Sequence, residues 1–258
     1  MNLRKYGTSP FSIVLVHGGP GAPGSMAPIA LELSKKYGIL EPFQSENSIK
    51  GQLSELKEQI TANADVPITL VGHSWGAWLS FIFSASYPDV VGKLILINCG
   101  AFEDKYLSLM HKKRKNNLTS EENKKASIIY EKLLNDSTEN REEILNEFGK
   151  LMSKADSFCP IEDKGYAIDF QPEVFKNCME EINRLRTSGD LLKIGYDIKC
   201  PVIAIHGEDD PHPYEGVEKP LSNVLKNFSF YLLKKCGHSP WNEKYAREDF
   251  YRILYENL

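Results

Sequence analysis

The stretch VGHSWG, residues 71–76, places a serine between two glycines at the end of an apolar run. Residues 67–72 predict a strand, and the apolar run 75–87 predicts a buried helix that ends before Pro88. In a G-x-S-x-G turn between a strand and a helix, the serine is forced into a sparsely populated backbone conformation. The same letters also occur by chance in ordinary turns, so the interpretation depends on what the rest of the chain supplies.

The 258-residue chain has the composition of a globular protein. Hydrophobic residues make up 41% and charged residues 26%, so a substantial core can form. The net charge of −4 gives no reason to expect nucleic acid or an anionic membrane as the partner. No apolar run approaches the ~20 residues that span a bilayer, and we expect no membrane association.

The amino-terminal segment and the cysteines predict the cellular compartment. Basic residues precede a short apolar run at 11–16, but no small-residue cleavage site follows it, so no signal peptide is expected. The five cysteines form no C-x-x-C pair, which argues against a disulfide framework or a zinc site. The sequence therefore predicts a cytoplasmic protein.

Strand-like and helical segments alternate along most of the chain, which predicts an α/β fold with a mostly parallel sheet and helices on both faces. The alternation stops at residues 102–186, where only helical patterns occur. We expect a core of residues 1–101 and 187–258, with residues 102–186 inserted as a helical cap. The expected strands are 11–16, 38–43, 67–72, 93–98, 201–207 and 228–233, and the expected helices are 48–62, 75–87, 120–134, 138–153, 172–187, 214–226 and 241–258.

Two of these helices begin with capping signals. Ser48 is the expected N-cap of helix 48–62. Thr119 and Glu122 have the spacing of a capping box at the start of helix 120–134.

Ser74 needs a base and an orienting acid before it can act as a nucleophile. In folds with this turn, the order along the chain is serine, acid, histidine. Of the six histidines, only His212 and His238 follow the strand 201–207. His238 lies in a glycine-containing loop after the last strand, whereas His212 lies between two prolines, a stiff setting that suits a turn. His238 is therefore the candidate base.

The acid is expected in HGEDDPHP, at the end of the strand 201–207. Asp210 directly precedes a proline, which favours an extended conformation at the end of the turn. Asp209 is the first alternative. The second is an acid after the strand 93–98, at Glu103 or Asp104.

The segment HGGPG, residues 17–21, follows the first predicted strand and can supply a backbone donor. A hydrolytic transition state needs two N–H groups aimed at the developing oxyanion. Trp75, directly after the serine, is one candidate donor, and Gly19 is the other because Pro20 has no N–H. A phosphate-binding loop is the competing interpretation, but neither GxxxxGK[ST] nor GxGxxG is present.

Two further groups are alternative reactive sites. Cys236 lies two residues from His238 but outside any strand–helix turn, so we expect a buried thiol there. His206 and Asp209 are spaced like metal ligands, but no further ligand cluster accompanies them. No metal and no other cofactor is expected.

HGGPG, GHSWG, HGEDDP and CGHSPW, in this order, resemble the α/β-hydrolase superfamily, and the first two resemble its proline iminopeptidase branch most closely. The resemblance covers roughly residues 11–100 and 189–258 and implies an α/β-hydrolase fold with a helical cap. It implies that Ser74 is the nucleophile, Asp210 the acid and His238 the base. It also implies that Gly19 and Trp75 are the two oxyanion donors.

The chain departs from that branch in two places. The branch usually has two strands before the one that ends in HGG, whereas only about ten residues precede it here, so we expect a sheet shortened at that edge. The branch usually reads GGSWG, whereas His73 gives GHSWG, as in many esterases. Acids of the cap hold the substrate amine in the branch, and candidates here are Glu142, Glu143, Glu180 and Glu181, each of which also fits a solvated helix face.

The sequence thus predicts a serine hydrolase that works through an acyl-enzyme. Its substrate is expected to be a short peptide with an N-terminal proline or similar residue, or a small carboxylic ester. The alternatives are a carboxylesterase without peptidase activity, a non-hydrolytic ligand-binding or receptor-type protein of the same fold, and lyase or transferase chemistry on the same residues.

Overall fold

The computed structural model describes residues 3–133, 140–161 and 171–258. Within them, seven strands form one sheet in the order β1-β3-β2-β4-β5-β6-β7. Neighbouring strands are parallel except β1 and β3, so the predicted mostly parallel sheet is confirmed. The strands are β1 (Leu3–Tyr6), β2 (Phe11–Val16), β3 (Gly38–Pro42), β4 (Ile68–His73), β5 (Val91–Ile97), β6 (Val202–Gly207) and β7 (Phe228–Leu233).

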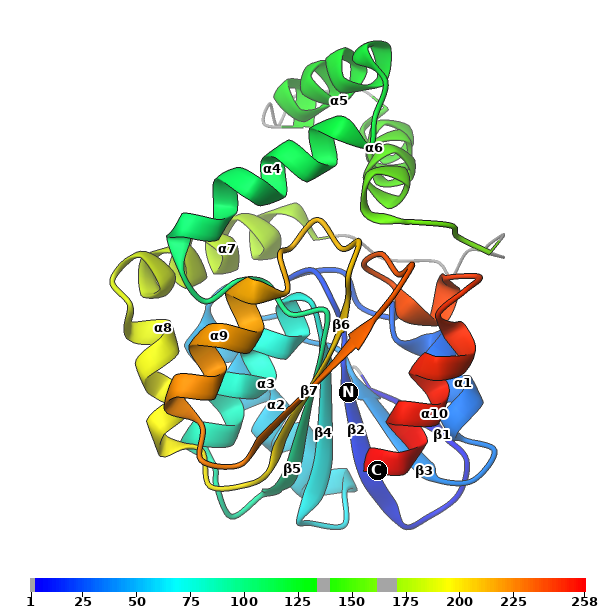
Figure 1. The fold of residues 1–258 in the computed structure, drawn as a ribbon. Helices are drawn as coiled ribbons and strands as arrows, with labels where there is room; N and C mark the ends of the chain where they lie inside the picture. Colours follow the sequence, from blue (N-terminus) through cyan, green and yellow to red (C-terminus); the bar gives the residue numbers. More distant parts are fainter. Residues whose placement is uncertain (1–2, 134–139, 162–170) are drawn as a thin grey trace.

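Helices cover both faces of the sheet (Figure 1). The alternation of side chains along β2 shows the two resulting cores: Ile13 and Leu15 pack on the side of α1 and α10, and Val14 and Val16 pack on the side of α2 and α3. The first face is covered by α1 (Ala27–Leu33) and α10 (Arg247–Asn257), and the second by α2 (Ile49–Asn63), α3 (Trp75–Ser86), α8 (Asp190–Lys193) and α9 (Glu215–Val224).

A helical insertion, from α4 to α7, lies between β5 and β6 in the described part of the chain. Three of its helices, α4, α5 and α6, project beyond the carboxyl ends of the strands (Figure 1). The fourth, α7, packs on the core, because Val174, Cys178 and Ile182 belong to the same buried cluster as α3. The four helices are α4 (Leu107–Asn116), α5 (Ser120–Leu133), α6 (Arg141–Asp156) and α7 (Pro172–Thr187).

Most predicted elements are present, with ends that differ by at most two residues. The predicted helix 138–153 is α6, displaced three residues toward the carboxyl terminus, and residues 134, 138 and 139 lie outside the described part of the chain. The predicted start of the last helix is wrong: a short 3-10 turn occupies Pro240–Asn242, and α10 begins only at Arg247. Glu243 lies between these two elements, and its side chain is buried.

Some elements have no clear signal in the sequence, among them β1, α1 and α4. Strand β1 is a polar edge strand that exists through antiparallel pairing with β3, from Leu3 opposite Pro42 to Tyr6 opposite Ile39. Among the described residues, β1 is the strand that precedes β2 in the sequence, and it pairs at the edge beyond β3.

Both predicted helix caps are confirmed. The Ser48 hydroxyl accepts a hydrogen bond from the Gly51 amide at 3.1 Å. The Thr119 hydroxyl accepts from the Glu122 amide at 3.2 Å, and the Glu122 carboxylate accepts from the Thr119 amide at 2.9 Å.

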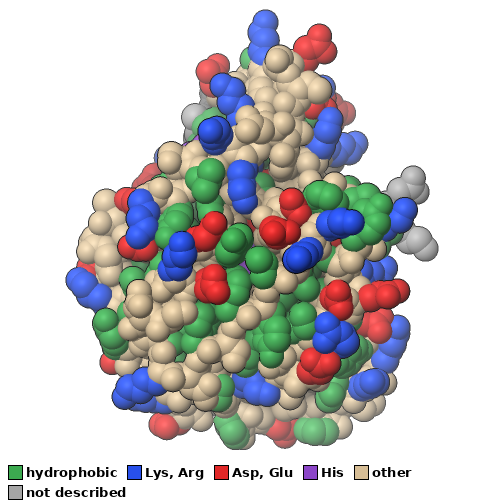
Figure 2. Space-filling model, viewed as in Figure 1, with side chains coloured by type: hydrophobic (Ala, Val, Ile, Leu, Met, Phe, Trp, Pro, Cys, Tyr) green, Lys and Arg blue, Asp and Glu red, His purple; other side chains and the backbone are tan. Residues whose placement is uncertain are grey.

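The surface carries charges of both signs. Figure 2 shows lysine, arginine and acidic side chains mixed around the projecting helices, and hydrophobic side chains gathered on the face between α9 and α10. No helix in the described part of the chain combines the length and apolar character needed to cross a bilayer. All five cysteines are free thiols.

The start of α3 crosses the carboxyl end of β2 at very short range. A Cβ atom on Gly76 would lie 2.3 Å from the Val16 carbonyl oxygen and 2.5 Å from that of His17. A Cβ atom on Gly72 would lie 2.2 Å from the carbonyl oxygen of Gly76. Both glycines of G-x-S-x-G are therefore required by space, and they bring the serine turn against the segment that follows β2.

Gly76→Ala is expected to destabilise the protein by about 3 kcal/mol or more, because backbone atoms rather than flexible side chains occupy the required space. Gly149→Ala is the matched control. It lies within α6 with nothing within 4 Å of its added Cβ, so it should stabilise by about 0.5–1 kcal/mol. Urea unfolding of both variants measures the difference, and equal stabilities would contradict the short crossing.

Candidate active site

Ser74 has the strained backbone that the sequence predicts. Its φ of 54° and ψ of −115° lie outside the regions that non-glycine residues ordinarily occupy. The turn is held from both sides: the Ser74 amide donates to the carbonyl of Ile97 at 3.0 Å, and its carbonyl accepts from the amide of Ala77 at 3.1 Å. The hydroxyl is thereby presented at the carboxyl end of β4, where α3 begins.

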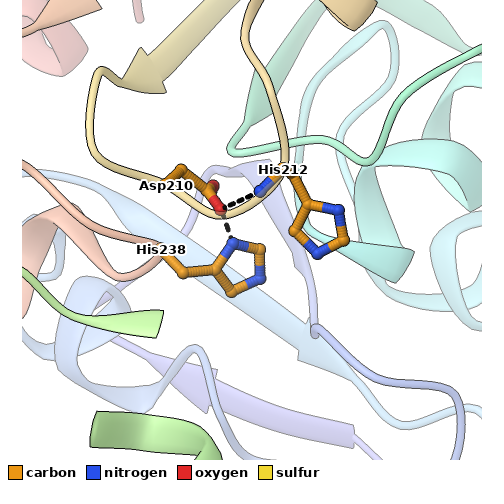
Figure 3. A group of neighbouring side chains, drawn as sticks. All are labelled: Asp210, His212 and His238. Carbon is orange, nitrogen blue, oxygen red and sulfur yellow. Dashed lines mark hydrogen bonds and ion pairs between the residues drawn. The ribbon is translucent and has the colours of Figure 1, made fainter. Parts of the chain in front are cut away.

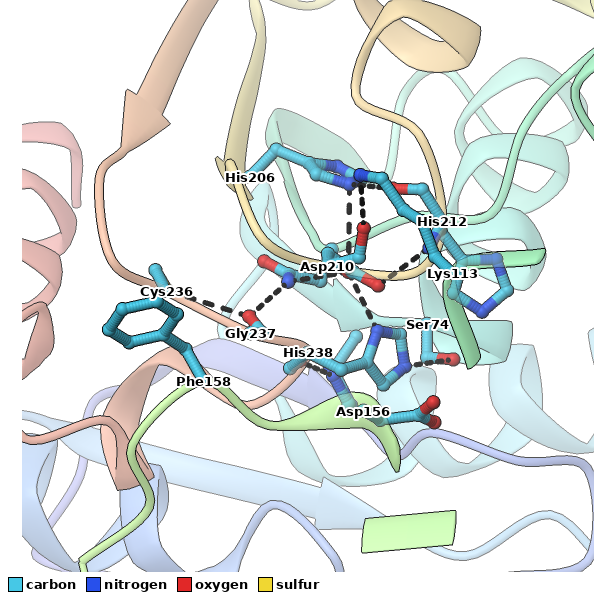
Figure 4. A network of polar contacts seen from close by, with 12 residues as sticks. Ser74, Lys113, Asp156, Phe158, His206, Asp210, His212, Cys236, Gly237 and His238 are labelled. Atoms are coloured by element: carbon cyan, nitrogen blue, oxygen red, sulfur yellow. Dashed lines mark hydrogen bonds and ion pairs between the residues drawn. The ribbon is translucent and has the colours of Figure 1, made fainter. Parts of the chain in front are cut away.

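A continuous chain of hydrogen bonds joins three residues that are far apart in the sequence (Figure 4). The Nδ1–H of His238 donates to Oδ2 of Asp210 at 2.8 Å. The Nε2 atom of His238 lies 3.0 Å from the hydroxyl oxygen of Ser74. Because Nδ1 carries the proton that binds the carboxylate, Nε2 accepts the hydroxyl proton. The three side chains thus have the geometric arrangement expected of a Ser-His-Asp triad.

Asp210 is fully buried, and each of its carboxylate oxygens accepts a hydrogen bond. Besides His238, Oδ2 accepts from the side-chain amide of Asn98 at 2.6 Å, and Oδ1 accepts from the main-chain amide of His212 at 2.9 Å. Burial alone would raise the pKa of Asp210, but the neighbouring histidines, His238 above all, hold it well below its usual range. The carboxylate is therefore ionised in the folded protein.

The pKa of His238 is raised above its ordinary value. Burial by itself lowers it, but the charge and hydrogen bond of Asp210 outweigh burial, and the carboxylate of Asp156 adds to the increase. An imidazole with such a neighbour is a stronger base than a free one, which suits the removal of a proton from Ser74.

Asp210, His212 and His238 form a compact group of side chains (Figure 3). One potential metal-ligand atom from each lies within 4.8 Å of the others. The Nδ1 atom of His238 and Oδ2 of Asp210 are already bonded to each other, and an ion on those two atoms would have to break that bond. The geometry fits a triad, with the His212 ring 5.0 Å from that of His238.

His73, the residue that departs from the proline iminopeptidase pattern, supports the base. Its Nε2–H donates to the carbonyl oxygen of His238 at 2.9 Å, and its ring contacts those of His238 and Trp241. Burial lowers the pKa of His73 to about 3, so the ring is neutral. The sequence shows that His73 precedes the serine, but it does not predict the contact of this ring with His238, 165 residues away.

The two candidate oxyanion donors, Gly19 and Trp75, lie in the segments that the crossing of Gly76 brings together. Trp75 is the first residue of α3, where an N–H has no acceptor within its own helix. Gly19 has a φ of 58°, and its carbonyl closes a turn by accepting from Ala22 at 3.0 Å. The indole of Trp75 points away from this chemistry, since its Nε1–H donates to the Gln52 side chain at 3.2 Å.

The alternative acids have other partners. Asp209 accepts a hydrogen bond from the amide of Cys236 at 3.2 Å. Glu103 and Asp104 form ion pairs with cations of the helical insertion, at 2.9 Å and 2.8 Å. Cys236, the alternative nucleophile, is fully buried, and burial raises the pKa of its thiol.

The candidate amine-binding acids of the insertion lie elsewhere. Glu143 and Glu180 are exposed to solvent. Glu181 accepts from the amide of Ile49 at 2.8 Å and so caps the start of α2. The side chain of Glu142 lies outside the described part of the chain.

The insertion does reach the site through residues that sequence reasoning missed. The main-chain carbonyl of Asp156 accepts from the amide of His238 at 2.7 Å. Its carboxylate forms a two-pronged ion pair with Arg114, at 2.6 Å and 2.7 Å. Lys113 donates to the main-chain carbonyl of Asp210 at 2.9 Å. No sequence signal marks these contacts, whereas Asn98 could have been noticed as a polar residue directly after a buried strand.

No protein-family model and no curated protein sequence matches the chain. Solved structures with a similar fold are VinJ, an esterase from Thermogutta terrifontis, and a serine hydrolase involved in carbazole degradation. VinJ is 18% identical, with a TM-score of 0.67, and the match covers 98% of this chain and 93% of VinJ. The esterase is 18% identical, with a TM-score of 0.62, and the match covers 98% of this chain and 91% of the esterase. The serine hydrolase is 17% identical, with a TM-score of 0.65, and the match covers 98% of this chain and 92% of the hydrolase. These likenesses, together with the sheet order and the turn at Ser74, identify the fold of this chain as the α/β-hydrolase fold.

Proposed function

We propose that this protein is a serine hydrolase that acts by acyl transfer. The observation that carries the proposal is the unbroken hydrogen-bond chain from Ser74 through His238 to the buried carboxylate of Asp210. A serine is a weak nucleophile by itself, and this arrangement supplies both the base that activates it and the acid that orients the base.

In the proposed mechanism, Nε2 of His238 takes the hydroxyl proton as Oγ of Ser74 bonds to the substrate carbonyl carbon. The oxyanion that forms accepts hydrogen bonds from the amides of Gly19 and Trp75. His238 then gives its proton to the leaving group, which departs as an alcohol or amine and leaves an acyl-enzyme. Water, deprotonated by His238, attacks the acyl carbon and releases the acid and free Ser74.

We propose a small carboxylic ester as the substrate, with residues 102–186 acting as a cap over the core of 1–101 and 187–258. An amine anchor needs a carboxylate without another partner. Among the described acids considered above, Glu143 and Glu180 face solvent and Glu181 caps a helix. The charge of Asp156 is balanced by Arg114. An ester requires no such anchor.

An N-terminal peptidase is the second candidate, because HGGPG and SWG resemble the proline iminopeptidases and Asp156 lies next to His238. Short p-nitrophenyl esters, assayed beside prolyl and acyl arylamides, separate the two. Turnover of esters alone supports the esterase. Faster turnover of a free-amine prolyl arylamide than of its N-acylated counterpart would instead support the peptidase.

Ser74→Ala is expected to lower ester hydrolysis by at least ~10³-fold, because the acyl-enzyme can no longer form. The fold should persist, since only one hydroxyl is removed. Ester turnover, labelling by a fluorophosphonate probe and thermal unfolding test this together. If the wild-type protein fails to react with the probe, a ligand-binding role for the fold replaces the proposal.

Asp210→Asn should lower kcat by about 10³–10⁴-fold, because the amide cannot both orient and stabilise the protonated histidine. The neighbouring Asp209→Asn is the matched control. Asp209 contacts the amide of Cys236 rather than the imidazole, so its loss should affect kcat far less. Ester kinetics for the two variants decide, and the reverse order would move the acid by one residue.

Hydrolysis should rise with pH through the pKa of His238, because only the neutral imidazole takes the Ser74 proton. That pKa is raised above 6.5: burial lowers it, and the charge of Asp210 more than compensates. The acidic limb of kcat/KM should therefore have its midpoint above pH 6.5. In Asp210→Asn the burial remains and the charge is lost, so the residual activity should show a midpoint at lower pH. An unchanged midpoint would argue against the pair.

A further inference from the structure

A strap, residues 156–161, leaves the end of α6 and runs beside the loop that carries His238. The amide of His238 donates to the carbonyl of Asp156 at 2.7 Å. Further along, the amide of Lys244 donates to the carbonyl of Cys159 at 2.9 Å, and the amide of Ile161 donates to the carbonyl of Asn242 at 2.8 Å. The strap and the chain on the carboxyl side of His238 are thus joined like two short strands.

A single buried carboxylate lies where these segments meet. Glu243 is only 1% exposed. Its Oε1 accepts from the amides of Phe158 at 2.8 Å and Gly237 at 3.0 Å, and its Oε2 accepts from the amide of Cys159 at 2.7 Å. A carboxylate loses much hydration energy on burial, so three charge-assisted bonds to main-chain amides are both its compensation and a strong restraint on those amides.

The restrained amide of Gly237 directly precedes His238. The carbonyl of Gly237 accepts from the side chain of Asn98 at 2.8 Å. A Cβ atom on Gly237 would lie 2.4 Å from the Asp156 carbonyl and 2.5 Å from Glu243 Oε1, so the strap, the carboxylate and the loop are in direct contact. The backbone around His238 is therefore fixed at consecutive peptide units: at Gly237 by Glu243 and Asn98, and at His238 by Asp156 and His73.

We propose that Glu243 is a positioning residue of this hydrolase. It ties the strap to the His238 loop and thereby holds the imidazole within hydrogen-bond distance of both Asp210 and Ser74. This role rests on the proposed function and assigns a part of the catalytic geometry to a side chain that touches neither substrate nor triad. A displacement of about 1 Å at a reacting group can cost about 10²-fold in rate, so a residue of this kind acts mainly on kcat.

The test compares Glu243→Gln with Glu243→Asp. In the glutamine variant one carboxylate oxygen becomes an NH₂ group that faces an amide donor, so at least one segment is released. We expect kcat for a p-nitrophenyl ester to fall about 10–100-fold while KM changes little, because the loss is in positioning rather than in binding. The aspartate variant keeps the charge with a shorter reach, so its kcat should lie between wild type and glutamine.

A spectroscopic readout follows the histidine without any substrate. The Nδ1 proton shared between His238 and Asp210 gives a far-downfield proton resonance in water. We expect this resonance in the wild-type protein, and we expect it to broaden or move upfield in Glu243→Gln. A residue that merely stabilised the fold would lower the unfolding temperature and leave the resonance of the folded protein unchanged.

Glu122→Gln is the matched control. Glu122 is also a carboxylate that accepts from a main-chain amide, and it pairs with Lys154 within the insertion at 2.6 Å, but it contacts neither the strap nor the His238 loop. Its kcat and its downfield resonance should equal those of the wild type.

The outcomes distinguish the positioning role of Glu243 from the proposed hydrolase function. Wild-type kcat together with a wild-type resonance in Glu243→Gln overturns the positioning role. If that variant does not fold, Glu243→Asp decides by the same two measurements. If the wild-type protein hydrolyses no ester or arylamide but shows the resonance, and Glu243→Gln loses it, the proposed function fails while the positioning of His238 by Glu243 stands.

Discussion

The short crossing between α3 and the end of β2 is the constraint on which the site depends. Because the Val16 carbonyl occupies the space that a side chain at Gly76 would need, only glycine fits in this first turn of α3. Ser74 is left in a backbone conformation that costs about 1–3 kcal/mol, which the buried apolar residues of α3 offset. The same crossing brings the segment that follows β2 against the start of α3, so the candidate nucleophile and both candidate oxyanion donors depend on it.

Around this turn the rings of His73 and His206 and the carboxylate of Asp210 are buried, and the rings of His212 and His238 are partly buried. Burial lowers the pKa of His73 to about 3 and lowers that of His206, so both rings stay neutral and act as hydrogen-bond donors to carbonyl groups. Asp210 is the one carboxylate of the group, and of the histidines only His238 has its pKa raised. The charge of Asp210 thus raises the pKa of His238 above its ordinary value, while the buried rings of His73 and His206 stay neutral.

The sequence predicted most of the sheet and the three triad candidates because both rest on local patterns. Buried parallel strands are continuous apolar runs, and the serine, acid and histidine each follow such a run. The contacts that hold them are different in kind. Glu243, Asp156 and Lys113 bind main-chain atoms of segments about 80 to 100 residues away, and nothing in the sequence next to these residues marks such a distant partner. Strand β1 was missed for a related reason, since pairing with β3 rather than its own composition makes it a strand.

The insertion contacts both the loop that carries Asp210 and the loop that carries His238. Lys113 donates a hydrogen bond to the carbonyl of Asp210, and the carbonyl of Asp156 accepts one from the amide of His238. On both loops the bonded atoms belong to the main chain, so these contacts restrain the position of the loop backbone. The arrangement of Ser74, His238 and Asp210 is therefore coupled to the placement of the insertion. The carboxylate of Glu243 completes this coupling, because it binds both the strap and the loop that carries His238.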